Sequence, residues 1–386
     1  MAIVDSILAV IGLASLIVAA GYSVLTLIAL FVWRGRKTPP HPQRLPPVSI
    51  LKPLCGAEPG LYENLRSFCQ QDYPEYQIVF GVLDPRDPAL AVVKRLMAEF
   101  PSLPIDVVAN PHQHGSNSKV NNLINIMAWA RHDVFAMADS DTCVGPDYLR
   151  TVTAPLQDRG VGLVTCLYRA VPTQLIYSRL GAMYINEWYM PSVLLAWLFG
   201  YQGYVSGQTI CVRRDTLQAV GGLQAMANHL ADDHRLGELV HAFGLQILLS
   251  PYVPTAEYHE PSLGAVTRHE VRWMRTIHVL RRRCFHFVFL SFSLPLALFG
   301  ILLVGGASSI TTAGWALFGT VVAARLALYV AHRSRRDRHL LRDLWLLPFR
   351  DLLLFWVWYR SLFTSRVTWR GNEFDVDAAG VMHRLS

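Results

Sequence analysis

The stretch Val134–Thr142, VFAMADSDT, decides how this chain folds and where its chemistry lies. Its first four residues are apolar, and such a short run bounded by polar residues predicts a buried strand. Asp139 and Asp141 follow at the end of this strand, and side chains two positions apart on a strand point the same way. Crowded carboxylates favour a divalent cation such as Mg²⁺ or Mn²⁺ that carries a diphosphate. The alternative is a surface turn, because Asp and Ser are common turn residues.

Predicted strands alternate with predicted helices on both sides of this stretch. This alternation predicts βαβ units, and therefore an α/β domain with a Rossmann-like, mostly parallel sheet. The other strands are expected at 48–51, 76–83, 105–109, 162–168 and 204–212, and the helices between the first strands at 61–70, 89–100 and 119–130.

Three polar signals come directly after predicted strands, namely Lys52-Pro53, Asp84-Pro85 and Asp139-Ser140-Asp141. Open α/β sheets bind their ligands at the carboxyl ends of the strands, so these residues are expected to share one edge. The chain has neither a G-x-G-x-x-G nor a G-x-x-x-x-G-K-[ST] motif, which disfavours a dinucleotide site and a P-loop. A metal held by the Asp139 and Asp141 carboxylates is therefore the expected phosphate anchor.

Long apolar runs predict a membrane protein, and 52% of the 386 residues are hydrophobic. The run 7–33 has no charged residue and exceeds the roughly 20 residues that cross a bilayer. A cleaved signal peptide is disfavoured there, because no basic segment precedes the run. The runs 287–306 and 310–331 predict a hairpin of two further spans. The run 344–363 is interrupted by charges and is expected to span, re-enter or lie in the interface. The run 190–199 is too short to span and is either a core helix or a lipid-facing surface.

Basic clusters flank the first three runs, of which 310–331 is interrupted only by Arg325, and set an orientation. They comprise Arg34, Arg36 and Lys37, then Arg281, Arg282 and Arg283, and finally Arg333, Arg335, Arg336 and Arg338. Because cytoplasmic flanks carry the excess of Lys and Arg, the stretch 34–283 is expected in the cytoplasm. The chain is thus expected to be a multi-pass membrane protein with a cytoplasmic catalytic domain.

The composition disfavours two other classes of site. The net charge of +7 could indicate nucleic-acid binding, but much of the excess lies at the membrane boundaries, where it meets anionic lipid headgroups. No nucleic-acid partner is therefore expected. The six cysteines show no C-x-x-C spacing, so reduced thiols are expected in place of a zinc site.

A second carboxylate pair, Asp232-Asp233, opens a predicted helix that ends before Gly244. A carboxylate beside another carboxylate has a raised pKa, and this suits a general base near neutral pH. The alternative is a helix N-cap, which is a common role for Asp at the start of a helix.

A basic and aromatic segment, His269-Glu270-Val271-Arg272-Trp273, precedes the arginines at 281–283. In a functional role Arg272 would neutralise a leaving diphosphate, and Trp273 would stack on a sugar or an acceptor. In a structural role the segment would be a membrane-surface helix with a Trp anchor. Both roles are compatible, since this segment joins the soluble domain to the membrane runs.

Taken in order, these motifs resemble those of inverting glycosyltransferases of the GT-A fold, in particular membrane enzymes of families 2 and 21. Within that group the chain is similar to ceramide glucosyltransferases and, more closely, to bacterial hopanoid-biosynthesis glycosyltransferases. The resemblance covers residues 45–285 and extends to the flanking spans and to Trp369-Arg370-Gly371. The segments that carry it are VSILKPL at 48–54, residues 64–73, Asp139-Ser140-Asp141, Asp232-Asp233 and His269-x-x-Arg272-Trp273.

The resemblance implies a role for each matching residue. Asp84 would recognise uracil, Asp139 and Asp141 would hold the nucleotide and the metal, and Asp233 would be the catalytic base. His269 departs from the family pattern, in which Gln or Arg is usual, and this puts its contact in question. The residues implied at the nucleotide-sugar site are Pro53, Asp84, Lys119, Asp139, His269, Arg272 and Trp273.

The resemblance also implies a plan of segments and a reaction. The segments are an N-terminal span with its basic flank (1–38), a GT-A domain (45–260), an interfacial helix (261–285), a transmembrane hairpin (286–332) and a C-terminal membrane-associated segment (333–386). The reaction would move a hexose, N-acetylglucosamine or glucose, from a UDP-sugar to a membrane lipid alcohol. A hopanoid polyol in a bacterial inner membrane is the preferred acceptor, and ceramide is the alternative.

Three rival functions are less compatible with the sequence. A processive polysaccharide synthase needs a transmembrane channel, for which three or four spans are too few. A non-enzymatic membrane scaffold would not need carboxylates at all three expected places. A transporter would carry more polar groups within its spans than the few charged residues found here.

Overall fold

The computed structural model describes residues 2–36, 44–305, 308–332, 342–363, 366–369 and 372–385. The chain forms two compact units, and each is discontinuous in the sequence. The α/β unit contains Arg36–Val171, Tyr201–His259 and Arg366–Ser386, and the helical unit contains Met1–Gly35, Pro172–Gly200 and Glu260–Ser365. The expected GT-A segment 45–260 is therefore interrupted, because Pro172–Gly200 belongs to the helical unit.

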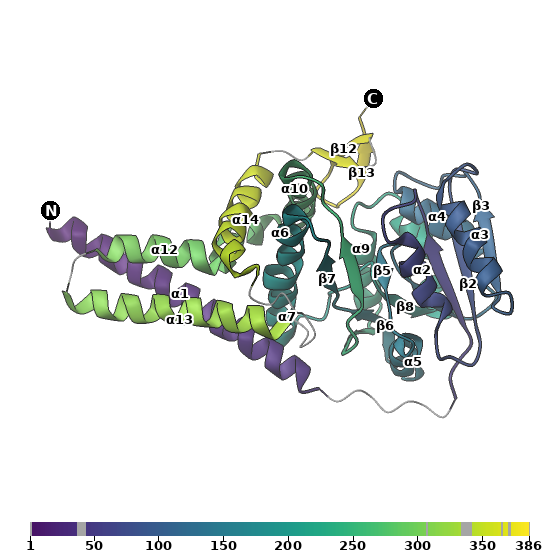
Figure 1. Ribbon diagram of the computed structural model, residues 1–386, viewed down its shortest axis with the longest axis horizontal. Helices are drawn as coiled ribbons and strands as arrows, with labels where there is room; N and C mark the ends of the chain where they lie inside the picture. Colours follow the sequence, from purple (N-terminus) through teal and green to yellow (C-terminus); the bar gives the residue numbers. More distant parts are fainter. Residues whose placement is uncertain are drawn as a thin grey trace. The chain divides into compact units, whose positions relative to one another are not determined.

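The α/β unit is built on a seven-stranded sheet with the order β3-β2-β1-β4-β8-β6-β9 (Figure 1). Strands β3, β2, β1 and β4 are parallel to one another, and β8 is antiparallel to both of its neighbours. The mostly parallel α/β sheet predicted from the sequence is thus confirmed. In order along the chain, the strands are β1 (Val48–Pro53), β2 (Tyr76–Val82), β3 (Ile105–Ala109), β4 (Val134–Met137), β6 (Val161–Cys166), β8 (Ile210–Arg213) and β9 (Gln246–Ser250).

Alternate side chains of the sheet enter two different cores, one on each face. Ile50 and Phe80 belong to the core that α2, α3 and α5 cover, whereas Leu51 and Val79 belong to the core that α4, α8 and α9 cover. Strands that are covered on both faces need apolar side chains throughout, which explains the continuous apolar runs in the sequence. The helices are α2 (Leu61–Cys69), α3 (Ala89–Glu99), α4 (Ser118–Met127), α5 (Tyr148–Thr153), α8 (Arg214–Ala219) and α9 (Asp232–Ala242), with 3-10 turns at η1 (Ala154–Gln157) and η3 (Leu223–Met226).

Two small sheets complete the α/β unit. One has the order β5-β10-β7, and the other, the C-terminal sheet, has the order β11-β12-β13. Their strands are β5 (Thr142–Cys143), β7 (Arg169–Pro172), β10 (Thr255–Tyr258), β11 (Arg366–Trp369), β12 (Asn372–Val376) and β13 (Met382–Arg384).

The helical unit contains a bundle of three apolar helices, α1 (Ala2–Arg34), α12 (Ser293–Val304) and α13 (Ser308–His332), which contact one another (Figure 1). Gly12 and Gly300 allow α1 and α12 to approach closely, since a Cβ at Gly12 would lie 2.6 Å from the Gly300 carbonyl oxygen. Such small-residue contacts are typical of helix packing in membranes.

Two of the described helices, α1 and α13, are long and apolar enough to cross a membrane. The run 287–306 differs from the expected span, because it starts with the 3-10 turn η4 (Val288–Ser291) and its helix α12 has only 12 residues. At 1.5 Å per residue α12 is about 18 Å long, well short of the roughly 30 Å bilayer core. The basic cluster at 333–338 and residues 370–371 lie outside the described residues.

A second set of helices in this unit, α6, α10 and α14, runs across the direction of α12 and α13 (Figure 1). Helix α10 packs against both α6 and α14. The run 190–199 forms helix α7, which packs against α1. The bounds are α6 (Ile176–Tyr184), the π-helix η2 (Ile185–Tyr189), α7 (Met190–Leu198), α10 (Leu263–Leu280), α11 (Arg282–Phe285), the 3-10 turn η5 (Leu344–Leu346) and α14 (Leu347–Ser361).

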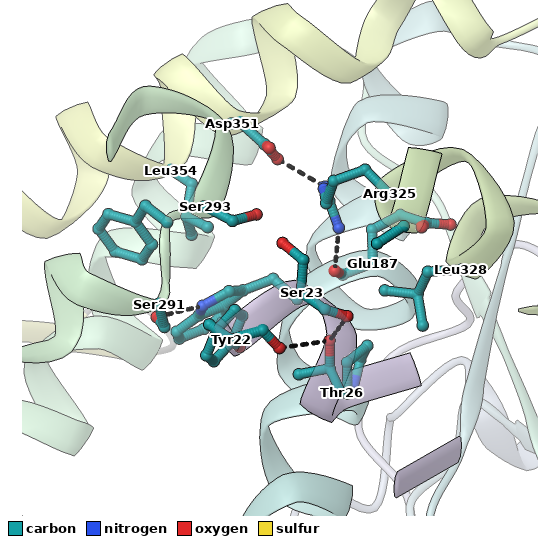
Figure 2. A pocket seen from close by; sticks show the side chains of 14 residues that line it. Tyr22, Ser23, Thr26, Glu187, Ser291, Ser293, Arg325, Leu328, Asp351 and Leu354 are labelled. Atoms are coloured by element: carbon teal, nitrogen blue, oxygen red, sulfur yellow. Dashed lines mark hydrogen bonds and ion pairs between the residues drawn. The ribbon is translucent and has the colours of Figure 1, made fainter. Parts of the chain in front are cut away.

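Buried polar side chains join these two sets of helices around a small cavity (Figure 2). The Arg325 guanidinium of α13 donates to Asp351 of α14 and to the backbone carbonyl of Glu187 in η2, both at 2.7 Å. Trp188 Nε1 donates to Ser291 Oγ at 2.9 Å. The cavity has room for about one water molecule, so this cluster ties helices together and does not enclose a larger ligand.

Candidate active site

The sheet brings the three polar signals of the sequence to one edge. Pro53 at the end of β1 is paired in register with Gly81 of β2, and Leu51 is paired with Met137 at the end of β4. Because these strands are parallel, their carboxyl ends meet at one edge, as expected. Strand β8 runs the other way, so the loop before it reaches the same edge: Ile210 pairs with Met137.

Lys119 lies between the two carboxylate pairs. Its ammonium group is 2.7 Å from Asp139 Oδ1 and 3.3 Å from Asp232 Oδ2. Burial alone would lower the pKa of Lys119, but the charges of Asp139, Asp232 and Asp233 outweigh this effect and raise it above its ordinary value. Lys119 therefore stays charged and holds together carboxylates from two segments of the chain.

Asp233 is not the N-cap residue of the helix that it opens. Helix α9 begins at Asp232, and Ala231 holds the N-cap position. Asp233 Oδ1 accepts from the backbone N–H of His234 at 2.8 Å in the first turn, and its Oδ2 accepts from the backbone N–H of Gly207 at 3.1 Å. Burial, and then the charge of Asp232, raise the pKa of Asp233 to about 6, although Lys119 opposes this. The carboxyl group is thus adjusted to exchange a proton near neutral pH.

The environment of Asp141 favours a bound cation. Burial, and then the charge of Asp139, raise the pKa of Asp141 to about 7. Its buried Oδ1 atom has no hydrogen-bond partner among the residues that the structure describes. A buried oxygen without a partner beside a second carboxylate fits a hard divalent cation. No group of three or more His, Cys, Asp or Glu side chains within metal distance occurs among the described residues, so other ligands would have to come from the substrate and water.

Lys52 is a site residue that the predicted site residues did not include. It lies at the end of β1, is completely buried, and donates to the Asp139 carbonyl oxygen at 2.5 Å. Its ammonium group also lies 3.9 Å from the centre of the Phe68 ring. Burial lowers the pKa of Lys52 to about 7, and the charges of Asp141 and Asp139 partly offset this. A lysine that ends a buried strand is the sequence signal, since Lys is rarely buried without a partner.

Gly207 is a second residue that the sequence analysis missed. Its carbonyl oxygen accepts from the Asp139 N–H at 3.1 Å, while its own N–H donates to Asp233. A Cβ at this position would lie 2.5 Å from Asp139 Oδ2 and 2.8 Å from Lys119 Nζ. A side chain at position 207 would therefore displace the Asp139 carboxylate or the Lys119 ammonium group, and no local pattern in the sequence marks this close approach.

Asp84 lies at the carboxyl end of β2 and remains accessible. Its side chain is 65% exposed, and its Oδ1 atom accepts from the backbone N–H of Arg86 at 2.8 Å. The turn therefore orients the carboxylate without burying it, as a residue that binds a nucleobase edge would need. Its role in recognising uracil stays a prediction.

The C-terminal sheet supports the loop that leads to Asp233. The N–H of Met382 in β13 donates to the carbonyl of Asn228 at 2.8 Å, and the N–H of Leu230 donates to Gly380 at 3.0 Å. The Ser116 hydroxyl donates to the Met382 carbonyl and to Asn228 Oδ1, both at 3.0 Å. These contacts fix the loop before α9 and the loop before α4. Lys119 lies in the first turn of α4.

The three motif residues of α10 belong to the helical unit. Nδ1 of His269 lies 2.7 Å from Glu260 Oε1, and its ring lies 4.2 Å from that of Trp273. The Trp273 ring also packs against Tyr184, with 5.3 Å between the ring centres. Burial lowers the pKa of His269, although the hydrogen bond with Glu260 opposes this. The structure thus places His269 and Trp273, which are one helical turn apart on α10, in one aromatic cluster.

The mostly parallel sheet, with one carboxylate pair after β4 and a second at the start of α9, gives this chain a fold like that of GT-A glycosyltransferases. The mannosyltransferase PcManGT from Pyrobaculum calidifontis, solved in complex with GDP-Man and Mn²⁺, has a similar fold. Its TM-score to this chain is 0.53 at 19% identity, and the alignment covers 92% of this chain and 99% of that one.

The chain belongs to glycosyl transferase family 21, whose sequence profile matches residues 12–382. Ceramide glucosyltransferase 1 of Caenorhabditis elegans is 22% identical to it over 353 residues, which cover 89% of this chain and 74% of that protein. The ceramide glucosyltransferase of Komagataella phaffii is 30% identical over 143 residues, which cover 36% of this chain and 28% of that protein.

Proposed function

We propose that this protein transfers a hexose from a UDP-sugar to the hydroxyl group of a membrane lipid, with inversion at the anomeric carbon. The observation that carries the proposal is the state of Asp233, a partly buried carboxylate beside Asp232 that is held by the N–H of Gly207 and whose pKa is raised to about 6. Such a group can accept a proton from an alcohol as the alcohol attacks.

The donor is proposed to bind across the strand ends of the α/β unit. Asp84 would contact the uracil, Pro53 would border the same edge, and Asp139 with Asp141 would hold a divalent cation, Mg²⁺ or Mn²⁺. The unpartnered Asp141 Oδ1 atom supports this assignment, as does the Mn²⁺ in the PcManGT complex. The cation, when bound, would stabilise negative charge on the departing diphosphate.

Two lysines and one arginine are proposed to support the departure of the nucleotide. Lys119 already bridges Asp139 and Asp232, and Lys52 lies behind Asp139. Arg272 would bind the diphosphate, because a guanidinium matches phosphate oxygens with paired hydrogen bonds. Trp273 would stack on the sugar or the acceptor, and His269, held by Glu260, would contact the diphosphate in place of the usual Gln or Arg.

The transfer itself is one displacement. Asp233 takes the proton of the acceptor hydroxyl while that oxygen attacks the anomeric carbon from the face opposite the diphosphate. The bond between the anomeric carbon and the diphosphate oxygen breaks, and UDP leaves with the bonding electron pair. The products are a glycolipid of inverted anomeric configuration, UDP and a proton on Asp233.

Ceramide is the acceptor that we propose first, because the ceramide glucosyltransferases are the named relatives; glucose is the corresponding sugar. The resemblance to hopanoid-biosynthesis enzymes makes a hopanoid polyol with N-acetylglucosamine the second candidate. We further propose that α1 and α13 anchor the protein in a membrane, since both are long and apolar enough to span it, with the α/β unit on the cytoplasmic side.

Mass spectrometry of the lipids made by vesicles containing the full chain tests this proposal. The vesicles are supplied with UDP-glucose or UDP-N-acetylglucosamine and with ceramide or a hopanoid polyol. A single glycolipid is the expected product; a polymer would indicate a polysaccharide synthase instead. If no pair yields a product, and UDP with Mn²⁺ causes no shift in thermal stability, a non-enzymatic scaffold would be the better description.

A further inference from the structure

Helix α14 exposes an apolar face and buries charged side chains. The side chains that face away from the protein from η5 through α14 are nearly all apolar, and each is between 42% and 68% exposed; they are Trp345, Phe349, Leu352, Phe355, Trp356, Tyr359 and Phe363. Their spacing of three and four residues places them in one stripe along the helix. The charged residues Arg350 and Asp351 lie on the opposite, buried face. We call this stripe the aromatic face of α14.

The buried face of α14 is fully occupied by the helical unit. Arg350 makes two hydrogen bonds of 2.7 Å to the two carboxylate oxygens of Glu270 in α10, and Asp351 pairs with Arg325 of α13. Both ion pairs are almost completely shielded from solvent. The rotation of α14 about its own axis is therefore fixed, and the aromatic face must point outward.

Another surface is expected to shield the aromatic face from water, because soluble proteins rarely expose contiguous apolar patches so large. The residues of the face favour a lipid bilayer as that surface. Tryptophan and tyrosine prefer the headgroup level of a membrane, and the face carries only one charge, Arg360, next to Trp356 at its end. Helix α14 also contacts α12 in the same unit that contains the candidate spans α1 and α13.

The orientation of α14 follows from two observations. In Figure 1 it runs across the direction of α12 and α13, as α10 and α6 do. Its Trp and Tyr residues lie at 345 and at 356–359, so the two groups are only about 17 Å apart at 1.5 Å per residue. In a helix that spans the bilayer, these residues gather instead at two interfaces roughly 30 Å apart.

We propose that α14 is an in-plane membrane helix, whose aromatic face lies in the interface of a lipid bilayer while its charged face holds α10 through the Arg350–Glu270 pair. The proposal rests on the membrane location proposed above. The α14 proposal adds that α10 is held at a fixed height above the acyl chains. Helix α10 carries His269, Arg272 and Trp273. A lipid acceptor would then meet this helix at the level of its own hydroxyl group.

Depth measurement by spin labelling tests the proposal. The full chain, with exposed Cys55 and Cys284 replaced by serine, is placed in vesicles of phosphatidylcholine with a minority of phosphatidylglycerol. Single nitroxide labels at F349C, L352C, W356C and Y359C are compared by collision with oxygen and with a water-soluble nickel complex. An in-plane helix predicts one shallow depth for all four labels, about 5–10 Å below the headgroups.

Two controls calibrate this scale. I17C, in the middle of α1, should be deep, and W129C, at an exposed position of the α/β unit, should be accessible to nickel. A depth that changes by about 15 Å between positions 349 and 359 would mean that α14 spans the membrane, and would overturn the proposal. Nickel access at all four labels, or protection from both reagents as under a second protein, would overturn it too. Glycolipid formation in the same vesicles is measured separately, so a protein without activity but with the flat depth profile would count only against the proposed reaction.

Discussion

The protein contains two clusters of charged side chains that differ in how the charges are paired. In the helical unit, Arg350 pairs with Glu270 and Arg325 pairs with Asp351, and the buried Glu187 also lies near Arg325. In the α/β unit, two lysines face four partly buried carboxylates, which are Asp139, Asp141, Asp232 and Asp233. Among the described residues, both arginines of the first cluster are in direct ion pairs, whereas Asp141 and Asp233 of the second make none.

This difference separates the pairs that hold helices from the candidate site. A buried ion pair such as Arg350–Glu270 fixes the orientation of its helices. At Asp141 and Asp233, burial first and then the charge of a neighbouring carboxylate raise the pKa. Such perturbed groups in one cluster are the features expected of an active site.

The largest expected effect comes from removing the base. Asp233→Asn keeps the size of the side chain but cannot accept a proton, so glycolipid formation should fall by at least about 10³-fold. Binding of UDP-sugar, measured by titration calorimetry, should persist. The matched control is Asp215→Asn, an exposed surface carboxylate of the same unit that pairs with Arg159. Normal turnover by the Asp233 variant would disprove the assignment.

Breaking the Arg350–Glu270 ion pair should lower the stability of the folded protein. Arg350→Met leaves Glu270 buried without its partner, and the free energy of unfolding should fall by about 3–5 kcal/mol. Replacing both residues, with Arg350→Met and Glu270→Leu, should recover most of this loss because no charge is left unpaired. Arg360→Met, at an exposed position on the same helix, should change it by less than about 0.5 kcal/mol. Thermal unfolding in detergent measures all three; a single and a double variant of equal stability would contradict the pairing.

The charge cluster of the α/β unit should behave in the opposite way: removing one of its carboxylates should stabilise the folded protein. The folded-state pKa of Asp141 is about 7, above its ordinary value of 3.8. Folded protein therefore loses stability as the pH rises from about 4 to 7, and the penalty is complete above 7. Asp141→Asn should raise stability at pH 8 in EDTA by on the order of 2 kcal/mol, with a smaller gain at pH 5. The same variant should lose the stabilisation by UDP with Mn²⁺, and an unchanged response to Mn²⁺ would exclude Asp141 as a ligand.

The smallest expected effect is on the pH profile. Asp233 must be deprotonated to act, so kcat/KM should be constant above its pKa of about 6 and fall about tenfold by pH 5. The carboxylate pair titrates as a unit. Removing the neighbouring charge with Asp232→Asn should shift the acid limb to lower pH, whereas a profile that does not move would show that another group limits the rate.

The fold was largely predictable from the sequence, because its signals are local. Apolar runs bounded by polar residues correctly marked β3 and β4, and the mostly parallel sheet followed from their alternation with helices. The 287–306 run was harder to interpret. Its composition is uniformly apolar, yet the 3-10 turn at Val288–Ser291 leaves a short helix. Hydropathy reports the surroundings of a segment and not its backbone geometry.

The candidate site was predictable only in part. Asp139, Asp141 and Asp233 follow strands or open a helix, so the pattern identifies them, and the structure gives the N-cap position of α9 to Ala231. Gly207 and the supporting strand β13 act through contacts between distant segments. No single stretch of sequence records such contacts. For the same reason the sequence could not tell that Arg350 and Asp351, which interrupt an apolar run, point into the protein.

The contact between β13 and the loop before α9 has a consequence for how the protein is assembled. The Ser116 hydroxyl and the Met382 carbonyl that meet there are 266 residues apart in the chain, and much of the helical unit lies between them. Contacts of such sequence separation form late in folding, since a long loop must close first. The sheet around β1, β2 and β4 can form early, but the loop of Asp233 gains its last partners only after the apolar helices have been synthesised. The candidate site would therefore be completed only after the helical unit has been synthesised.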